Sequence, residues 1–411
     1  MQHTAPKDNI TSVKPPQLGL FEFICLMALM TSLVALSIDA MLPAMNQIGA
    51  DLGSSSQQQV HLIVSLFFIG MAVGQLFFGP FADAKGRRLC ILVGLVIFAI
   101  GSCICMYASN MNEMLLGRLI QAIGVSGPRI AAMAVIRDQF SGDAMARVMS
   151  FIMVVFIFVP MIAPLIGQTV LYWYSWQHIF GLFLIVALIS GIWFFSRQAE
   201  TLPASMRKPF SWGAFWQSLK FIFTHREVMG FSLALGFIFG AFLAYLSASQ
   251  TIFQTFYLTG ELFPLIFALL AGSIGLASFF NGTLVMRLGM HRLCRIALIG
   301  TVACSAVLLI TVMGYKGMPP LAVFIALLFV NFFFIGILFG NLNAMAMQPL
   351  GEMAGLGAAI IGSLTSLLSV PIAMLIDLFI TANVLPIALG FVVFCTLAFV
   401  SVYWAEKASH P

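Results

Sequence analysis

Charged side chains are scarce in this sequence: only 8% of the 411 residues are Asp, Glu, Lys or Arg, against about a quarter in soluble domains. With 61% hydrophobic residues, the chain could not surround a single core with a water-compatible surface. This composition excludes a soluble globular protein and indicates a chain that crosses a membrane several times. The net charge of +5 is spread over short segments between apolar runs, so we expect no nucleic-acid partner.

Motifs of the common enzyme and cofactor classes are also missing. The sequence has no Walker motif, no dinucleotide fingerprint, no clustered His/Cys metal set and no nucleophile arrangement. Its seven cysteines lie nearly all inside apolar runs and show no CxxC or Cys/His pairing, which predicts inert small side chains. We therefore expect no enzyme, no cofactor and no metal site.

Long apolar runs dominate what remains. A membrane-spanning helix needs about 20 apolar residues, and helices are the default because an open sheet edge is not stable in lipid. Residues 1–19 lack the apolar core and cleavage site of a secretory signal, so the first run is expected to stay as a helix. Cutting at charged residues and at Gly or Pro predicts twelve spans: 20–44, 60–80, 89–108, 113–136, 146–170, 178–196, 228–257, 262–286, 293–314, 320–346, 355–381 and 385–404.

The placement of positive charge predicts the orientation of these spans. With both termini in the cytoplasm, only Lys316, Arg118 and Arg129 of the 19 Lys and Arg fall outside cytoplasmic segments, as the positive-inside rule expects. The predicted fold is all-α, with twelve spans in two pseudo-symmetric six-helix bundles. The predicted parts are a tail at 1–19, bundles at 20–197 and 227–404, a linker at 198–226 and a tail at 405–411. In the linker, aromatic residues alternate with Lys208 and Lys220, which favours an amphipathic helix on the membrane surface over a flexible tether.

Asp39 is the most unusual residue of the first span. Together with Thr31 and Ala35 it forms a small or polar stripe on an otherwise apolar helix. A carboxylate at that depth costs about 3 kcal/mol on insertion scales, so it should face protein or water and be partnered or protonated for much of the time. Proton coupling requires such a group. The alternative is that Asp39 lies at a hydrated helix end, where it forms hydrogen bonds and takes no part in proton coupling.

The fourth span carries two cations on one face. Arg118, Gln121 and Arg129 share that face, with the arginines roughly 16 Å apart along the axis. Arg118 is expected at the depth of Asp39 and is its predicted partner, while Arg129 lies deeper and is a candidate for the substrate cavity, as is Gln121. The alternative for each arginine is packing against backbone carbonyls. Arg137 and Asp138 are interpreted as a surface ion pair.

Other candidates lie in the fifth span and the second half. Pro160, Pro164 and Gly167 would allow bending or close packing of the fifth span, as a moving gate or as an ordinary membrane helix. Asp377 lies near the outer boundary, where capping or solvation is favoured over a second proton site. With 40 Phe and 24 Met, a cavity lined by aromatic and thioether groups and a few amides would suit bulky, partly apolar ligands. The polar cavity candidates of the second half are Gln250, Gln254, Tyr257, Asn331 and Asn341.

A short basic loop, residues 79–88, separates the second and third spans. It combines a glycine and a proline with one acid and a cluster of positive charge, which predicts a tight turn held by ion pairs at the membrane surface. A weaker copy occurs at residues 281–292, which indicates two similar halves. The candidate residues of a conformational latch in the first loop are Gly79, Asp83, Gly86, Arg87 and Arg88.

These residues resemble the major facilitator superfamily, and more narrowly the drug:proton antiporters of the bicyclomycin/chloramphenicol-resistance (Bcr/CflA) family. The loop 79–88 is similar to the signature between helices 2 and 3, in which ion pairs latch neighbouring helices. Residues 118–122 resemble the helix 4 signature, residues 36–43 the helix 1 pattern, and residues 160–167 the helix 5 antiporter motif. The resemblance implies that Asp39 carries the proton and that Arg118 takes part in its transfer.

Three hypotheses follow. The preferred one is a proton-coupled exporter of small amphipathic molecules that works by alternating access as a monomer in the bacterial inner membrane. The second is a facilitator or proton symporter that imports a nutrient or small organic anion, with Arg129 binding a carboxylate. The third is a receptor or scaffold that binds without transporting.

Overall fold

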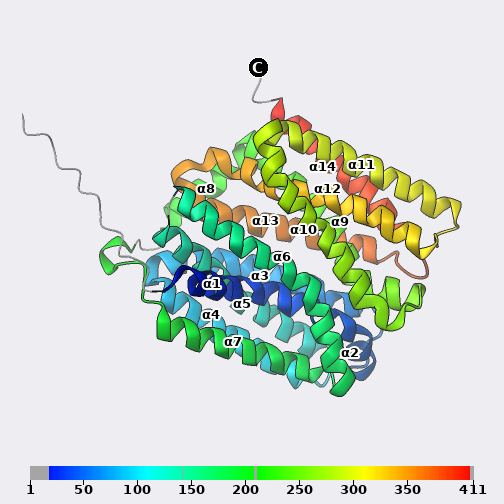
Figure 1. The fold of residues 1–411 in the computed structure, drawn as a ribbon, viewed down its shortest axis with the longest axis horizontal. Coiled ribbons are helices and arrows are strands. Elements are labelled where there is room, and N and C mark those ends of the chain that lie inside the picture. Colours follow the sequence, from blue (N-terminus) through cyan, green and yellow to red (C-terminus); the bar gives the residue numbers. More distant parts are fainter. Residues whose placement is uncertain (1–17, 141, 208–210, 408–411) are drawn as a thin grey trace, which may run out of the picture.

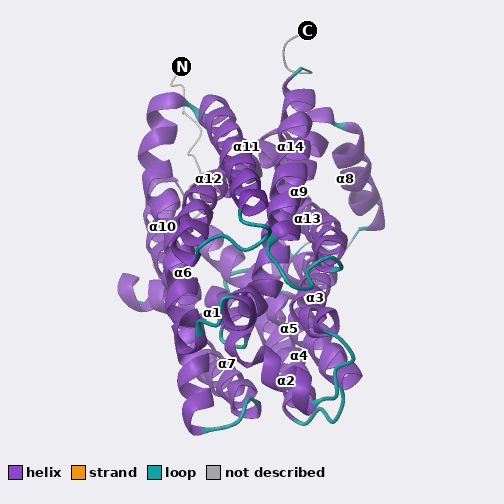
Figure 2. Cartoon of the chain, turned by 90° about the vertical axis from the view of Figure 1, so that its right-hand side faces the viewer, coloured by secondary structure: helices purple, strands orange, loops and turns teal. Residues whose placement is uncertain are grey.

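A computed structural model describes residues 18–140, 142–207 and 211–407 of the chain. Within these ranges it contains helices, turns and loops and no strand (Figure 2). Twelve of the helices are at least 20 residues long, and they correspond to the twelve predicted spans. Eleven are long and apolar enough to cross a membrane, and the remaining one, α6, includes the apolar stretch Phe158–Trp173. The prediction of an all-helical membrane protein is confirmed.

The first half of the chain forms one bundle, which is the lower one in Figure 1. After α1, a 3₁₀ turn, η1, and the short helix α2 carry the chain across to α3. The elements of this bundle are α1 (Leu20–Asp39), η1 (Leu42–Ala44), α2 (Met45–Asp51), α3 (Gln57–Lys85), α4 (Arg87–Met106), α5 (Met111–Gln139), α6 (Gly142–Trp173) and α7 (Gln177–Arg197).

The second half forms the other bundle, reached through helix α8 (Trp212–Thr224) in the predicted linker. Ser218 and Ile222 of α8 are buried, whereas Trp212, Trp216 and Phe223 are exposed, as expected of a helix with one face towards lipid. A π-helical turn, η3 (Thr251–Phe256), continues α9. The long helices of this bundle are α9 (Arg226–Gln250), α10 (Phe263–Leu288), α11 (Met290–Gly314), α12 (Leu321–Met347), α13 (Ala354–Asp377) and α14 (Leu385–Glu406).

The two bundles meet along two pairs of long helices. Helix α3 packs against α13, and α6 packs against α10. Figure 1 shows α8 at one end of the molecule and α2 at the opposite end. We call these the linker end and the α2 end. Asp39, at the last position of α1, therefore lies towards the α2 end, and the basic loop lies at the linker end.

The basic loop is tighter than the sequence suggested. The prediction that the helix ends at Gly79 and Pro80 is wrong, because α3 continues through Pro80 to Lys85 and the turn is confined to Gly86. Gly86 has φ of +100°, a conformation open to glycine, and Gly289 occupies the matching turn between α10 and α11 with φ of +76°. The two halves therefore repeat the same one-residue turn.

Replacing Gly86 by alanine is expected to destabilise the protein more than the same change at Gly289. Both substitutions place a side chain in a left-handed conformation, which costs roughly 1–2 kcal/mol. At Gly86 the new Cβ would also lie 2.6 Å from Oε2 of Glu200, whereas at Gly289 nothing lies within 4 Å. Thermal unfolding of both variants in detergent measures the difference; equal losses of stability would contradict the role given to the contact with Glu200.

Candidate functional site

Asp39 is buried at the end of α1, with 5% of its surface exposed. It forms no hydrogen bond or ion pair with any residue that the structure describes. It lies within electrostatic range of the Tyr245 hydroxyl of α9, in the other bundle, and that hydroxyl is itself buried without a hydrogen-bond partner. The carboxyl group is thus directed into the protein, not into lipid.

Close packing of α6 against the end of α1 shields this carboxyl group. Gly167 of α6 faces the backbone of Ala40, the residue after Asp39, and a Cβ at Gly167 would lie 1.8 Å from the carbonyl oxygen of Ala40. Only a glycine allows the two helices to approach this closely. Pro160 and Pro164 lie inside α6 in the turns before Gly167. Their role as a gate stays a prediction.

Arg118 is fully buried in α5, two turns from its beginning. It donates hydrogen bonds from Nη1 to the carbonyl oxygen of Ser37 at 3.1 Å and to Oε1 of Gln121 at 2.5 Å, and from Nε to the carbonyl oxygen of Ile63 at 3.3 Å. Its guanidinium also lies 4.3 Å from the ring centre of Phe67. Its Nη2 nitrogen has no partner, so one side of a buried cation remains available.

Asp39 and Arg118 do not form the predicted ion pair in this conformation. Arg118 instead contacts the backbone at Ser37, two residues before Asp39 on the same helix. Backbone carbonyls and the Phe67 ring therefore stabilise the guanidinium, and the carboxyl group is left without a counter-ion. Arg118 thus contacts the backbone of α1 two residues before Asp39, while the Asp39 carboxyl group lies in range of Tyr245 of the other bundle.

Gln121 supports Arg118 in this conformation, and its role in a substrate cavity stays a prediction. Its side chain is fully buried, accepts from Arg118 and donates to Oγ of Ser102 at 2.8 Å. Arg129 lies about two turns further along α5 than Gln121. It is half-buried and has neither a hydrogen bond nor an ion pair with the described residues. An unpaired cation between helices is suited to binding an anionic group.

The polar candidates of the second half lie between helices in this conformation, and their role in a substrate cavity stays a prediction. Asn331 donates to Oγ of Ser305, Asn341 donates to Oδ1 of Asn281, and Tyr257 donates to the carbonyl oxygen of Pro319. All three contacts lie within the second bundle. The spacing of residues along one helix could not indicate these partners, which come from other segments of the bundle.

Gln250 and Gln254 belong to the contact between the bundles. Gln250 donates from Nε2 to the carbonyl oxygen of Pro43 at 2.6 Å and to Oε1 of Gln254 at 2.7 Å, and it accepts from the backbone nitrogen of Asn46 at 3.0 Å. These bonds tie the end of α9 to η1 and α2. In this conformation Gln250 takes part in closing the α2 end, and the cavity role of both glutamines stays a prediction.

The basic loop is held by a set of charged contacts at the linker end. Arg87 pairs with Asp83 at 2.6 Å and with Asp138 of α5 at 2.9 Å. Glu200 accepts from the backbone nitrogens of Arg87 and Arg88 at 2.9 and 3.0 Å. The predicted surface pair of Arg137 with Asp138 is therefore wrong, because Asp138 pairs with the loop.

The loop glycines take different parts in this arrangement. Gly86 forms the turn, and Gly79 lies on α3 opposite Ala359 of α13, with 3.5 Å between a Cβ built at Gly79 and that of Ala359. Gly79 thus lies at the contact of the two bundles. The charged contacts of the loop all join parts of the first bundle and the start of the linker.

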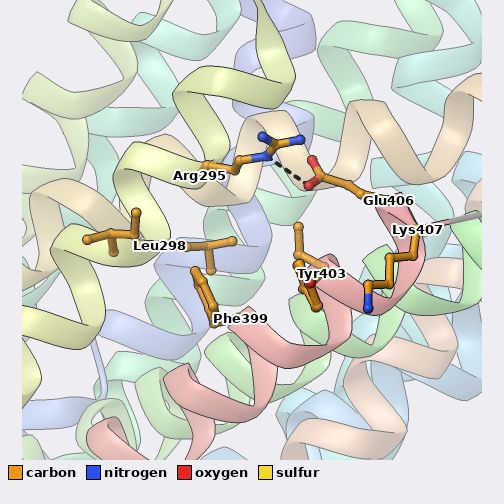
Figure 3. Close-up of a pocket in the computed structure, with 8 residues that line it drawn as sticks. Arg295, Leu298, Phe399, Tyr403, Glu406 and Lys407 are labelled. Carbon is orange, nitrogen blue, oxygen red and sulfur yellow. Dashed lines mark hydrogen bonds and ion pairs between the residues drawn. The ribbon is translucent and has the colours of Figure 1, made fainter. Parts of the chain in front are cut away.

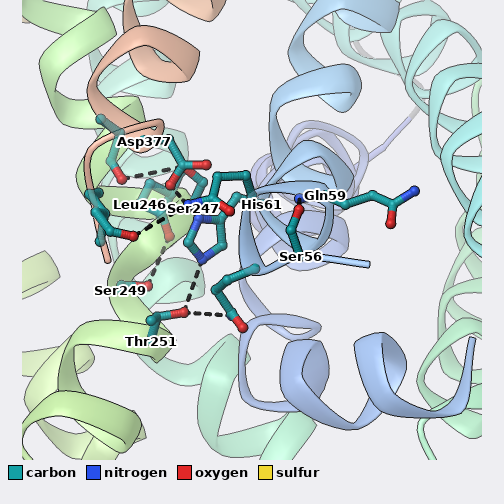
Figure 4. Close-up of polar contacts among 12 residues, drawn as sticks. Ser56, Gln59, His61, Leu246, Ser247, Ser249, Thr251 and Asp377 are labelled. Carbon is teal, nitrogen blue, oxygen red and sulfur yellow. Dashed lines mark hydrogen bonds and ion pairs between the residues drawn. The ribbon is translucent and has the colours of Figure 1, made fainter. Parts of the chain in front are cut away.

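His61 of α3 is a site residue that the sequence reasoning missed. It contacts Asp377 of α13 through Nδ1 and Thr251 of η3 through Nε2, the latter at 2.9 Å (Figure 4). The capping or solvated role predicted for Asp377 is wrong, since only 6% of its surface is exposed and its carboxylate is paired. The sequence could have indicated His61, because it is an ionisable residue inside an apolar run and such residues usually have a functional role.

A groove at the linker end has no part in this site. It has a volume of about 350 Å³ and lies between α11 and α14, where Arg295 pairs with Glu406 at 2.8 Å (Figure 3). Ile299 and Tyr403 in its walls are exposed side chains on the outside of the bundle. Its position on the outer surface separates it from Asp39 and Arg118.

Comparisons with known proteins agree with this architecture. The family model described as Major Facilitator Superfamily matches residues 27–374. An uncharacterised MFS-type transporter, YdgK, of Bacillus subtilis is 31% identical over 86% of this chain and 88% of its own length. A bicyclomycin resistance protein homolog of Haemophilus influenzae is 29% identical over 84% of this chain and 86% of its own.

A solved structure shares the fold at low sequence identity. The crystal structure of a D-xylose-proton symporter superposes with a TM-score of 0.75 at 14% identity, covering 94% of this chain and 97% of that one. At this identity the likeness concerns the arrangement of the helices alone.

Proposed function

Since the chain belongs to the major facilitator superfamily, we propose that this multi-pass membrane transporter is a proton-coupled exporter of small amphipathic molecules in the bacterial inner membrane. Alternating access would expose a cavity between the two bundles first to one side and then to the other. The similarity to a bicyclomycin resistance protein homolog supports export of drug-like molecules. The excess of basic residues at the linker end supports a cytoplasmic location for that end.

One observation carries the proton coupling: a buried carboxyl group that has no counter-ion among the described residues, on a helix whose backbone a buried arginine contacts two residues earlier. A carboxylate is costly in such a place and a protonated carboxyl is not, so in this conformation Asp39 holds a proton. When the bundles move and Asp39 meets water or Arg118, the proton is released. Binding and release of a proton are thus linked to the two openings of the molecule.

In the transport cycle, a proton from outside neutralises Asp39, weakens its attraction to Arg118 and lets the substrate leave outward. The proton then passes to the cytoplasm once the cavity opens inward. One charge that moves down about 100 mV supplies about 2.3 kcal/mol, enough for roughly a fiftyfold gradient of a neutral solute.

Inverted membrane vesicles test the proposal directly. With an imposed pH gradient, acid inside, we expect them to accumulate an amphipathic dye or antibiotic, and we expect a protonophore to abolish the accumulation. A pump-deficient bacterial host that produces the protein should also grow at higher concentrations of the transported antibiotics. Uptake that is indifferent to the pH gradient across a panel of such compounds would refute proton-coupled export.

Arg129 favours a second candidate function, the import of a small organic anion. It is a half-buried cation without a partner among the described residues, and a substrate carboxylate could neutralise it. The direction of transport distinguishes the two functions, because an importer would accumulate its substrate in right-side-out cells.

Replacing Arg129 by alanine separates these functions further. For an anion importer we expect the substrate affinity to fall by tenfold or more, since a charge-assisted hydrogen bond contributes about 1.5–3 kcal/mol. For an exporter of neutral or cationic amphipathic molecules we expect little change in affinity. Substrate binding to the purified protein, measured with Arg129→Lys as the charge-retaining control, gives the answer.

A further inference from the structure

Several side-chain contacts join the two bundles at the α2 end. His61 contacts Asp377 and Thr251, and Gln57 and Gln58 bond to Thr251 and to the carbonyl oxygen of Ile380. Gln250 completes the set through Pro43 and Asn46. At the linker end, the ion pairs of Arg87 and Arg295 each stay within one half of the chain.

At the centre of this set, His61 is only 2% exposed and lies between two groups of the other bundle. The hydrogen bond between Nδ1 of His61 and the carboxyl group of Asp377 places one proton between these two atoms. Gln57 donates to Oγ1 of Thr251 at 2.7 Å, which holds the hydroxyl of Thr251 beside Nε2 of His61. Figure 4 shows the imidazole between these partners, with α3 on one side and α9 and α13 on the other.

We infer that His61 and Asp377 form a gate pair that closes the transport pathway at the α2 end and separates each time that end opens. This inference rests on the proposed alternating access and adds two residues that it did not contain. Closing the pathway by a polar pair suits a reversible gate, because both groups are hydrated when they part. Their mutual attraction and their hydration nearly balance, so either state is accessible.

The surrounding backbone fits this role. Thr251 is the first residue of the π-helical turn η3, at the point where α9 leaves the regular α-helical ladder. Single π-helical turns are frequent at functional sites, because the widened turn re-aims side chains without ending the helix. Asp377 is the last residue of α13, so the two partners of His61 lie at a π-helical turn and at a helix end, both of which can move with the second bundle.

Hydrogen–deuterium exchange of the full chain in lipid nanodiscs tests the gate pair without any substrate. With Asp377→Ala, we expect backbone amides of residues 57–64 and 374–380 to exchange about tenfold faster, the factor that corresponds to losing one charged hydrogen bond. The double exchange His61→Asp with Asp377→His should restore the slow rate, because it re-forms the pair in the opposite sense. If Asp377→Ala fails to fold, His61→Gln provides the same test.

Asp51→Ala is the matched control. Asp51 also lies at the α2 end and accepts a hydrogen bond, at 2.8 Å from Nε1 of Trp176, but this contact stays within the first bundle. Its removal should leave exchange at residues 374–380 unchanged. Wild-type rates in Asp377→Ala, or an equal rise of exchange at both ends, would overturn the inference. Because this readout involves no transport, a failed transport assay would refute the proposed function and leave the gate pair to be judged on its own.

Discussion

Replacing Asp39 by asparagine is expected to abolish proton-driven accumulation. Asparagine has nearly the shape of a protonated aspartate but holds no exchangeable proton, so the cycle can no longer be driven by the pH gradient. The accumulation ratio in inverted vesicles should fall from at most roughly fiftyfold per proton to about one. Exchange of labelled for unlabelled substrate should persist, because that reaction needs no net movement of protons.

Two further measurements separate lost coupling from lost structure. The thermal stability of Asp39→Asn should equal or exceed that of the wild type, since the change removes a buried ionisable group without a counter-ion. Asp51→Asn, the same chemical change in a contact within the first bundle, should keep its accumulation. An Asp39→Asn variant that still concentrates substrate against its gradient would remove the basis of the coupling assignment.

The second large effect is expected from Gly167→Ala. The added methyl group would lie 1.8 Å from the carbonyl oxygen of Ala40, and a backbone atom cannot turn away as a side chain can. Helices α1 and α6 must therefore separate beside Asp39, at a cost of about 1–3 kcal/mol or more for overpacking. We expect a lower unfolding temperature and a loss of coupled transport, because water would reach the carboxyl group.

Gly181→Ala in α7 is the control for this change. A Cβ there would have only the terminal carbon of Met106 near it, at 4.0 Å. Alanine also favours a helix over glycine by up to about 1 kcal/mol, so this variant should be as stable as the wild type or more so. If both variants behave alike, the close contact at Ala40 is not what shields Asp39.

Much of the fold could be predicted because the membrane restricts the choices. Long apolar runs must become helices in a membrane. The charged residues between these runs located the twelve spans. The exit from α3 was misplaced for a physical reason: inside a packed membrane helix, Pro80 removes one hydrogen bond without ending the helix. Gly79 and Pro80 gave the strongest sequence signal for a turn, but the turn lies at Gly86.

Individual site residues could be predicted only where an ionisable side chain lies inside an apolar run. Burial of Asp39 and Arg118 follows from ionisable groups inside apolar runs, since such groups seldom face lipid. Their separation in this conformation does not follow, because it depends on the carbonyl of Ser37 and the ring of Phe67. The hydrogen-bond partners of Gln121 and Asn331 could not be predicted either, since residues on one helix face do not reveal which neighbouring helix supplies them.

The anchoring of Glu200 has a consequence for how the two bundles are joined. Its bonds to the backbone of Arg87 and Arg88 fasten the first part of the linker to the first bundle, while α8 packs against α9 and α13 of the second. Glu200 therefore moves with the first bundle, and α8 moves with the second. A relative rotation of the bundles therefore changes the distance between Glu200 and α8, and the length of chain between these two points limits that rotation.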